Sequence, residues 1–106
     1  SLSPEVHRVL REDLGFDGVV MTDDLAMSAV AAYAVDGAVA VMALEAGNDL
    51  IITMDYRTQI PKVIEALENG MLEEEAVDRA CLRVLRWKLE LGLLENMEEG
   101  TLVRAD

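Results

Sequence analysis

The chain has 106 residues, 52% of them hydrophobic, and a net charge of −12. This excess of acidic side chains disfavours nucleic acids and anionic membrane surfaces as partners, because both attract clustered Lys and Arg. The hydrophobic share argues against intrinsic disorder, and no apolar run approaches the roughly 20 residues of a membrane span. A single cysteine, Cys81, excludes an internal disulfide, and the sequence leaves the cellular compartment open.

Apolar residues at helical spacing alternate along the chain with two short, almost continuously apolar runs. Ser3 and Pro4 mark the start of the first helix, and Gly15, Gly47 and Gly92 mark the ends of three helices. We therefore expect helices at about residues 4–14, 25–33, 36–46, 59–69 and 73–91, strands at about 18–22 and 49–53, and a charged tail or linker at 95–106.

The two predicted strands, with helices between them, fit a right-handed unit of two parallel strands and a crossover helix. Two parallel strands do not form a stable sheet alone. Each would leave one backbone edge unpaired and one face uncovered. The sequence therefore predicts an α/β fold that is incomplete, as if two consecutive units had been taken from a larger sheet or barrel.

Two acidic residues, Asp23 and Asp24, stand at the end of the first predicted strand. Because side chains alternate between the faces of a strand, Asp23 shares a face with Val19 and Met21, and Asp24 lies on the other face. Loops at the carboxyl ends of parallel strands carry the chemistry of such folds. Asp23 is therefore a candidate catalytic residue, whereas Asp24 better suits capping of the following helix.

Other polar residues give weaker signals. Residues 48–49 predict a turn, and residues 55–57 predict a solvated loop at the same end of the sheet as Asp23. His7 is expected to be structural and Cys81 to be a buried, inert thiol. One histidine and one cysteine provide no metal-ligand spacing, and no glycine-rich phosphate loop is present, so no metal or cofactor is expected.

The segment LGFDGVVMTDDLAM, residues 14–27, closely resembles the nucleophile segment of glycoside hydrolase family 3, in its β-N-acetylhexosaminidase branch. The similarity continues through ALEAGNDLII at 43–52 and the last helix at 79–94, so it covers about residues 1–94. The resemblance implies a (β/α)8 TIM-type catalytic barrel of several hundred residues. This chain would supply its C-terminal part, the last two βα units and a C-terminal helix.

The resemblance also assigns a role to Asp23, because the family's nucleophile directly follows the Ser or Thr at the strand end. It implies a retaining β-N-acetylglucosaminidase that releases terminal β-linked N-acetylhexosamine from cell-wall or chitin-type glycans through a covalent glycosyl-enzyme. In this branch a histidine paired with an aspartate on an earlier barrel loop supplies the acid/base. That loop and the sugar-binding segment lie outside this chain, so we expect the isolated chain to be inactive. Its partners would be the carbohydrate and the remainder of the barrel.

Two alternatives remain open. The first is a β-glucosidase of the same family, which the segment Thr-Asp-Asp-Leu at residues 22–25 disfavours, since the glucosidase branch tends to place Trp after its nucleophile. The second is a non-catalytic α/β module that self-associates through unpaired strand edges and an exposed apolar face.

Overall fold

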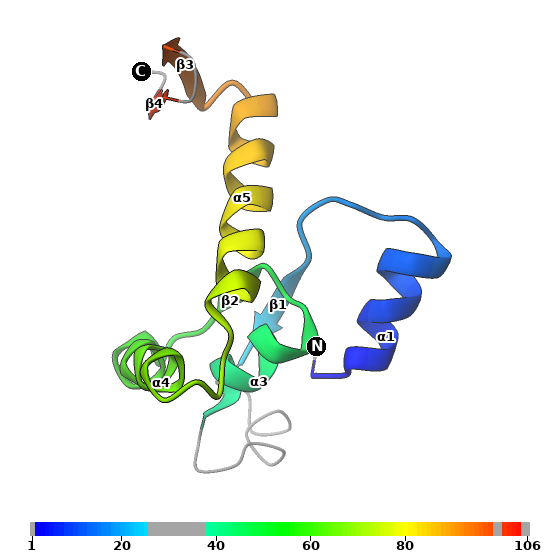
Figure 1. Cartoon of the computed structure of the whole chain (residues 1–106), viewed down its shortest axis with the longest axis vertical. Coiled ribbons are helices and arrows are strands. Elements are labelled where there is room, and N and C mark those ends of the chain that lie inside the picture. The colour runs from blue at the N-terminus through cyan, green and yellow to red at the C-terminus, as the bar shows by residue number, and fades with distance from the viewer. Residues whose placement is uncertain (1, 26–37, 99–100, 105–106) are drawn as a thin grey trace.

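The computed structural model describes residues 2–25, 38–98 and 101–104. A two-stranded parallel sheet lies among helices, and a long helix carries an antiparallel hairpin away from them (Figure 1). The elements are α1 (Pro4–Arg8), the π-helix η1 (Val9–Asp13), β1 (Met21–Asp24), α3 (Val39–Ala46), β2 (Leu50–Ile52), α4 (Tyr56–Glu68), α5 (Glu74–Glu90), β3 (Leu94–Glu98) and β4 (Thr101–Arg104). None of the helices in these residues has the length and apolarity required to cross a bilayer.

The first predicted helix is confirmed over its length, with a change of helical type halfway. Ser3 caps it as expected, its Oγ accepting the N–H of Val6 at 3.3 Å. In η1 the turns widen, and the N–H of Leu14 donates to the carbonyl of Val9 at 3.0 Å. Gly15 then leaves the helix at a φ of +67°, a conformation that favours glycine. The helix predicted at 25–33 lies, apart from Leu25, outside the described residues.

The two strands pair in parallel, as predicted, but with shifted bounds. β1 occupies residues 21–24 rather than 18–22, and β2 occupies residues 50–52 rather than 49–53. Ahead of β1, the carbonyl of Val20 accepts the N–H groups of both Asp49 and Leu50, and the regular ladder begins one residue later, at Met21. Asp23 and Asp24 are consequently the last two residues of the strand rather than the first two of a loop.

The core is centred on α3, which is hydrophobic on nearly every side and is therefore covered on more than one face. On one side Leu25 and the partly buried Ile51 pack with the helix. On another, Ala66 of α4 and Leu72 pack around Val41. The buried residues of α3 are Val39, Ala40, Val41, Ala43 and Ala46. The core is aliphatic, as the low aromatic content of the sequence predicted.

The helix predicted to begin at Gln59 instead begins three residues earlier, at Tyr56. The carbonyl of Asp55 accepts the N–H of Gln59 at 3.1 Å and so closes the first turn before Pro61. Pro61 thus lies inside α4, where its missing N–H removes one intrahelical hydrogen bond. The side chain of Gln59 also joins two helices, because its Oε1 accepts the N–H of Ala40 at 3.0 Å in the first turn of α3.

Helix α5 is present as predicted, but its predicted buried face is only partly covered: Val77, Val84 and Leu85 are half-buried, whereas Cys81 and Leu89 are exposed. Ala80 is its buried residue, whereas Leu89 is 36% exposed. The prediction that the Cys81 thiol is buried is wrong, because that side chain is exposed. The cause is visible in Figure 1: the C-terminal half of α5 rises away from the other helices and the parallel sheet. The expected face was Val77, Cys81, Val84, Leu85 and Leu89.

The prediction of a charged tail or linker at residues 95–106 also needs correction. β3 and β4 form an antiparallel hairpin there, with Leu94 opposite Arg104 and Glu95 opposite Val103. Backbone pairing of this kind does not require an apolar periodicity, so the high charge of the segment concealed it.

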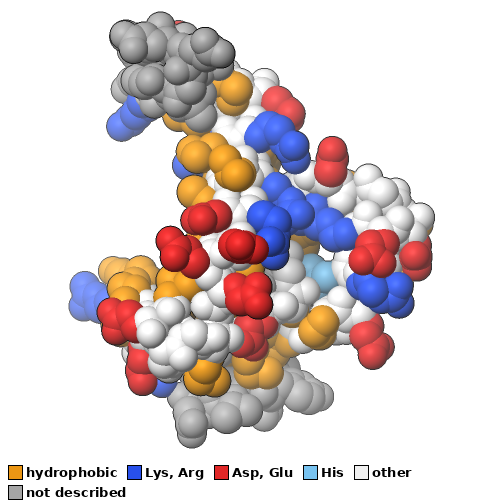
Figure 2. Space-filling view, in the orientation of Figure 1, with side chains coloured by type: hydrophobic (Ala, Val, Ile, Leu, Met, Phe, Trp, Pro, Cys, Tyr) orange, Lys and Arg blue, Asp and Glu red, His pale blue; other side chains and the backbone are white. Residues whose placement is uncertain are grey.

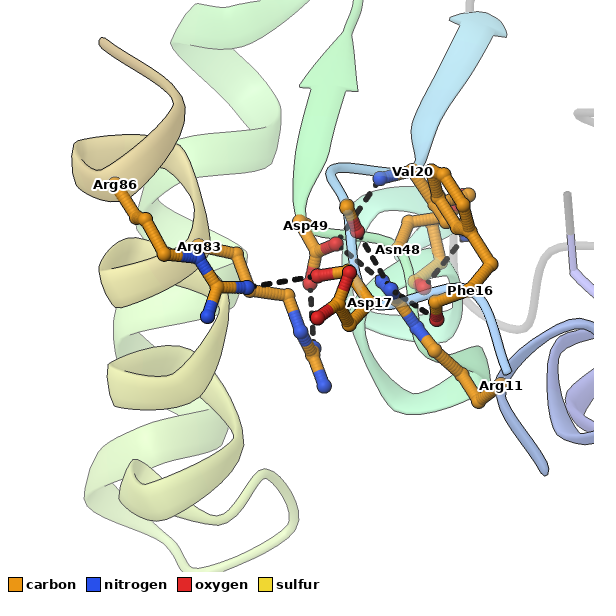
Figure 3. A network of polar contacts seen from close by, with 10 residues as sticks. Arg11, Phe16, Asp17, Val20, Asn48, Asp49, Arg83 and Arg86 are labelled. Carbon is orange, nitrogen blue, oxygen red and sulfur yellow. Dashed lines mark hydrogen bonds and ion pairs between the residues drawn. The ribbon is translucent and has the colours of Figure 1, made fainter. Parts of the chain in front are cut away.

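A buried carboxylate holds the starts of both parallel strands together (Figure 3). Asp49, with a side chain 1% exposed, accepts hydrogen bonds from Arg11 of η1, from Arg83 of α5 at 2.9 Å, and from the N–H of Val20 at 3.0 Å. Arg11 also donates to the carbonyl of Gly18. On the face shown in Figure 2, basic side chains gather where α5 lies beside the N-terminal segment. The network therefore joins η1, the residues directly before β1 and β2, and α5.

We predict that Asp49→Ala strongly destabilises the chain. The substitution leaves two partly buried guanidinium groups and the N–H of Val20 without their acceptor, which costs about 3–5 kcal/mol for a buried pair. The control is Glu75→Ala, since Glu75 pairs with Arg79 at 4.0 Å with both side chains mostly exposed, an interaction of about 0–1 kcal/mol. Urea unfolding at one fixed protein concentration measures both. Equal losses in the two variants would contradict the prediction.

Candidate functional site

The candidate site lies at the carboxyl end of the parallel strands, where Asp23 is the next-to-last residue of β1. Its side chain is exposed, as is that of Met21, whereas Thr22 between them is 3% exposed. The predicted alternation of faces is therefore confirmed for these three residues. Within the described chain, the Asp23 carboxylate takes part in one hydrogen bond, accepting the N–H of Asp24 at 2.8 Å. It is thus presented from a strand end with its side chain exposed.

The pairing of β1 with β2 shifts register next to Asp23, as a β-bulge does. The pairing advances three residues along β1, from Met21 to Asp24, while it advances two along β2, from Leu50 to Ile52. Bulges of one extra residue bend a strand locally, re-aim its side chains and are enriched beside active sites. Sequence reasoning missed this feature, because a one-residue slip leaves no mark on the hydrophobic pattern.

The loop after β2 lies at the same end of the sheet, as predicted. The N–H of Asp55 donates to the Thr53 hydroxyl at 3.1 Å. The guanidinium of Arg57 lies over the ring of Tyr56, 5.8 Å from its centroid. In the described part of the chain Arg57 makes no ion pair with a carboxylate. Tyr56 and Arg57 form the first turn of α4, so they are held by a helix rather than by a free loop.

An apolar hollow of about 270 Å³ opens beside this end of the sheet. It runs from Thr53 and Tyr56 along the space between β2 and α4. Its remaining lining residues are Ala40, Ile51, Gln59, Ile60, Val63 and Ile64. With this apolar lining the hollow suits a packed hydrophobic side chain better than a sugar.

The other polar residues singled out from the sequence lie away from Asp23. His7 is buried in α1, and its Nδ1 lies 2.8 Å from the carbonyl of Ser3. Its ring also packs against Gly47, which agrees with the structural role expected of it. Asp49, predicted to form a turn, lies at the opposite end of the strands in the arginine network. No group of three His, Cys, Asp or Glu residues in the described part of the chain could hold a metal ion.

Sequence reasoning missed two contributors. The first is Thr22, whose Oγ1 accepts the N–H of Ile52 and so joins the strands beside Asp23. The second is Asp49, whose partners stand 38 and 34 residues away. For Asp49 a signal existed, because an acid buried at the start of an apolar strand needs compensating charges, but the sequence does not say which arginines supply them.

Fold and site together define a parallel α/β chain that presents an exposed carboxylate from the end of a strand. A family model described as "Glycosyl hydrolase family 3 N terminal domain" matches residues 1–87. The chain is 39% identical over 61 residues to a β-hexosaminidase of Methylococcus capsulatus, covering 58% of this chain and 18% of that protein. It is 35% identical over 98 residues to a β-hexosaminidase of Thioalkalivibrio sulfidiphilus, covering 91% and 27%. A β-glucosidase of Rhizobium radiobacter is 31% identical over 89 residues, covering 84% and 10%.

Solved structures agree with these relatives. A glycoside hydrolase family 3 β-N-acetylglucosaminidase from Paenibacillus sp. str. FPU-7 has a TM-score of 0.74 at 34% identity, covering 93% of this chain and 20% of that one. The β-N-acetylglucosaminidase from Thermotoga maritima has a TM-score of 0.73 at 32% identity, covering 81% and 20%. This chain therefore belongs to glycosyl hydrolase family 3. It spans less than a third of the length of the curated relatives named above.

We predict that Asp23→Asn leaves the stability of the chain within about 0.5 kcal/mol of its original value. The side chain is exposed and asparagine keeps the oxygen that accepts the N–H of Asp24, so the change touches no buried group. Thermal unfolding monitored by circular dichroism provides the measurement. A large loss of stability would instead assign Asp23 a structural role.

Proposed function

We propose that this chain is the C-terminal part of the catalytic barrel of a retaining β-N-acetylglucosaminidase, and that Asp23 is its nucleophile. The observation that carries the proposal is the exposed Asp23 carboxylate at the carboxyl end of a parallel strand. Membership of glycosyl hydrolase family 3 and the β-hexosaminidase relatives support the reaction class. The proposed substrate is a glycan that ends in β-linked N-acetylhexosamine, as in cell walls or chitin.

The proposed chemistry explains why a carboxylate belongs at this position. In a retaining glycosidase one ionised carboxylate attacks the anomeric carbon and forms a covalent glycosyl-enzyme, which water then hydrolyses. The attacking oxygen must be held in place, and a strand end is more rigid than a loop. A second group must protonate the leaving oxygen, and by resemblance it lies on an earlier barrel loop outside this chain.

The uncovered surfaces of the chain support the proposal that other polypeptide completes a barrel around it. Met21 and Ile52 of the parallel sheet are 45% and 43% exposed. Tyr56, Ile60 and Ile64, four residues apart on α4, form a further exposed apolar stripe. In a closed barrel these side chains would be covered by the preceding strands and helices.

A β-glucosidase of the same family is the second candidate, and one relative carries that name. The segment at residues 22–25 argues against it, because Asp24 stands directly after the proposed nucleophile, where the glucosidase branch tends to have Trp. Rates with chromogenic N-acetylglucosaminide and glucoside, measured side by side, separate the two candidates.

We predict that the complete barrel enzyme containing this chain hydrolyses a chromogenic N-acetylglucosaminide and that Asp23→Asn lowers kcat about a thousandfold or more. The isolated chain should show no turnover, because it lacks the acid/base loop. Asp78→Asn, an exposed acid on α5, is the control and should leave the rate unchanged. Turnover by the isolated chain that disappears in Asp23→Asn would overturn the proposal that the acid/base lies outside this chain.

Self-association of the isolated chain is a separate proposal. The parallel sheet has two strands, so each strand has an unpaired edge among the described residues, and the apolar side chains named above face solvent. Such edges and patches favour pairing with a second copy when the natural neighbour is missing.

We predict a dimer or larger species for the isolated chain in analytical ultracentrifugation. Ile60→Glu together with Ile64→Glu should shift the mass toward the monomer, since both charges enter the exposed stripe of α4. Lys62→Glu, a charge change on the same helix but outside the stripe, is the matched control. A well-folded monomer at all concentrations would contradict the prediction.

A further inference from the structure

The end of β1 is joined to β2 by a side chain as well as by backbone pairing. Thr22 is 3% exposed, and its Oγ1 accepts the N–H of Ile52 at 2.9 Å. The carbonyl of the same Ile52 accepts the N–H of Leu25 at 2.9 Å. The N–H and the carbonyl of Ile52 therefore bond to Thr22 and Leu25, which lie on either side of Asp23 in the chain. The contact lies where the register shifts, so that two β1 residues lie opposite one β2 residue.

A second, longer contact acts on the other side of the carboxylate. The Asp24 Oδ1 accepts the N–H of Met54 at 3.4 Å, in the loop that follows β2. The N–H of Asp24 in turn donates to Oδ1 of Asp23 at 2.8 Å. Met54, Asp24 and Asp23 thus form a short chain of hydrogen bonds from the β2 loop to the candidate nucleophile.

We propose that Thr22 and Asp24 are positioning residues that fix the direction of the Asp23 carboxylate across the bulge. Thr22 supplies the stronger, buried anchor and Asp24 the weaker one toward the β2 loop. This inference rests on the proposed nucleophilic role of Asp23. A displacement of about 1 Å at a reacting group can lower a rate about a hundredfold, so the loss of an anchor should act on kcat with little change in KM.

The first test uses the 106-residue chain and needs no activity. Thr22→Val keeps the shape of the side chain but removes the acceptor, whereas Thr22→Ser keeps the hydroxyl. By NMR, amide exchange of Ile52 should speed up about tenfold in the valine variant, which corresponds to the loss of one hydrogen bond. Three-bond couplings should show Asp23 in one χ1 rotamer in the original chain and in Thr22→Ser, and averaged among rotamers in Thr22→Val. Identical couplings in both variants would overturn the inference.

A second pair of variants protects the test against misfolding at the buried threonine. Asp24→Ala removes the oxygen that Met54 uses, and Asp24→Asn keeps it. The alanine variant should increase exchange of the Met54 amide and shift the Asp24 amide resonance, while the asparagine variant should change both less. Equal effects of the two variants would exclude Asp24 from the positioning role.

Rate measurements on the complete enzyme distinguish failure of this inference from failure of the proposed function. In the complete enzyme, Thr22→Val should lower kcat about tenfold to a hundredfold at unchanged KM, and Thr22→Ser should recover most of that loss. If Asp23→Asn abolishes turnover while Thr22→Val and Thr22→Ser have equal rates, the positioning role fails and the nucleophile stands. If Asp23→Asn keeps full activity, the proposed function fails, and the NMR couplings still decide whether Thr22 fixes the side chain.

Discussion

The fold depends on one buried carboxylate. Asp49 receives two arginines and a backbone N–H from segments that are distant in the sequence, so its two oxygens join η1, the start of β1 and α5. Taking such charges out of water is expensive, and good geometry with several donors offsets that expense. In a chain with a net charge of −12, placing two of its few arginines here concentrates positive charge where it aligns the strands.

The two ends of the parallel strands therefore differ: the carboxylate at the start is buried and paired, and the one at the carboxyl end is exposed. At the start, Asp49 is buried and accepts three donors, and the preceding residue Asn48 is buried as well. At the carboxyl end, Asp23 is exposed and accepts the N–H of Asp24. Because of this separation, the proposed nucleophile takes part in none of the ion pairs found among the described residues, while the alignment of the strands still determines where it lies. A change at Asp49 would consequently reach Asp23 through strand register.

The sequence predicted those features of the fold that depend on residues close together in the chain. The Ser3 cap, the glycine that ends the first helix and the alternation of Met21, Thr22 and Asp23 all depend on nearby residues. The bulge could not be predicted, since a slip of one residue is decided by the neighbouring strand. The arginine partners of Asp49 and the uncovered face of α5 are likewise decided by three-dimensional arrangement. The hairpin at the C-terminal end was missed because charged residues were interpreted as a tail.

The uncovered surfaces bear on the chemistry as well as on the fold. An exposed carboxylate is surrounded by water, which weakens its interactions with any developing positive charge, whereas a closed site of lower effective dielectric strengthens them. In the proposed barrel, the polypeptide that covers Met21 and Ile52 would also enclose the face from which Asp23 projects. Completing the hydrophobic packing and removing water from the nucleophile would then be one event. On this proposal, the nucleophile would lie in a part of the barrel that depends on the rest of the polypeptide both for packing and for exclusion of water.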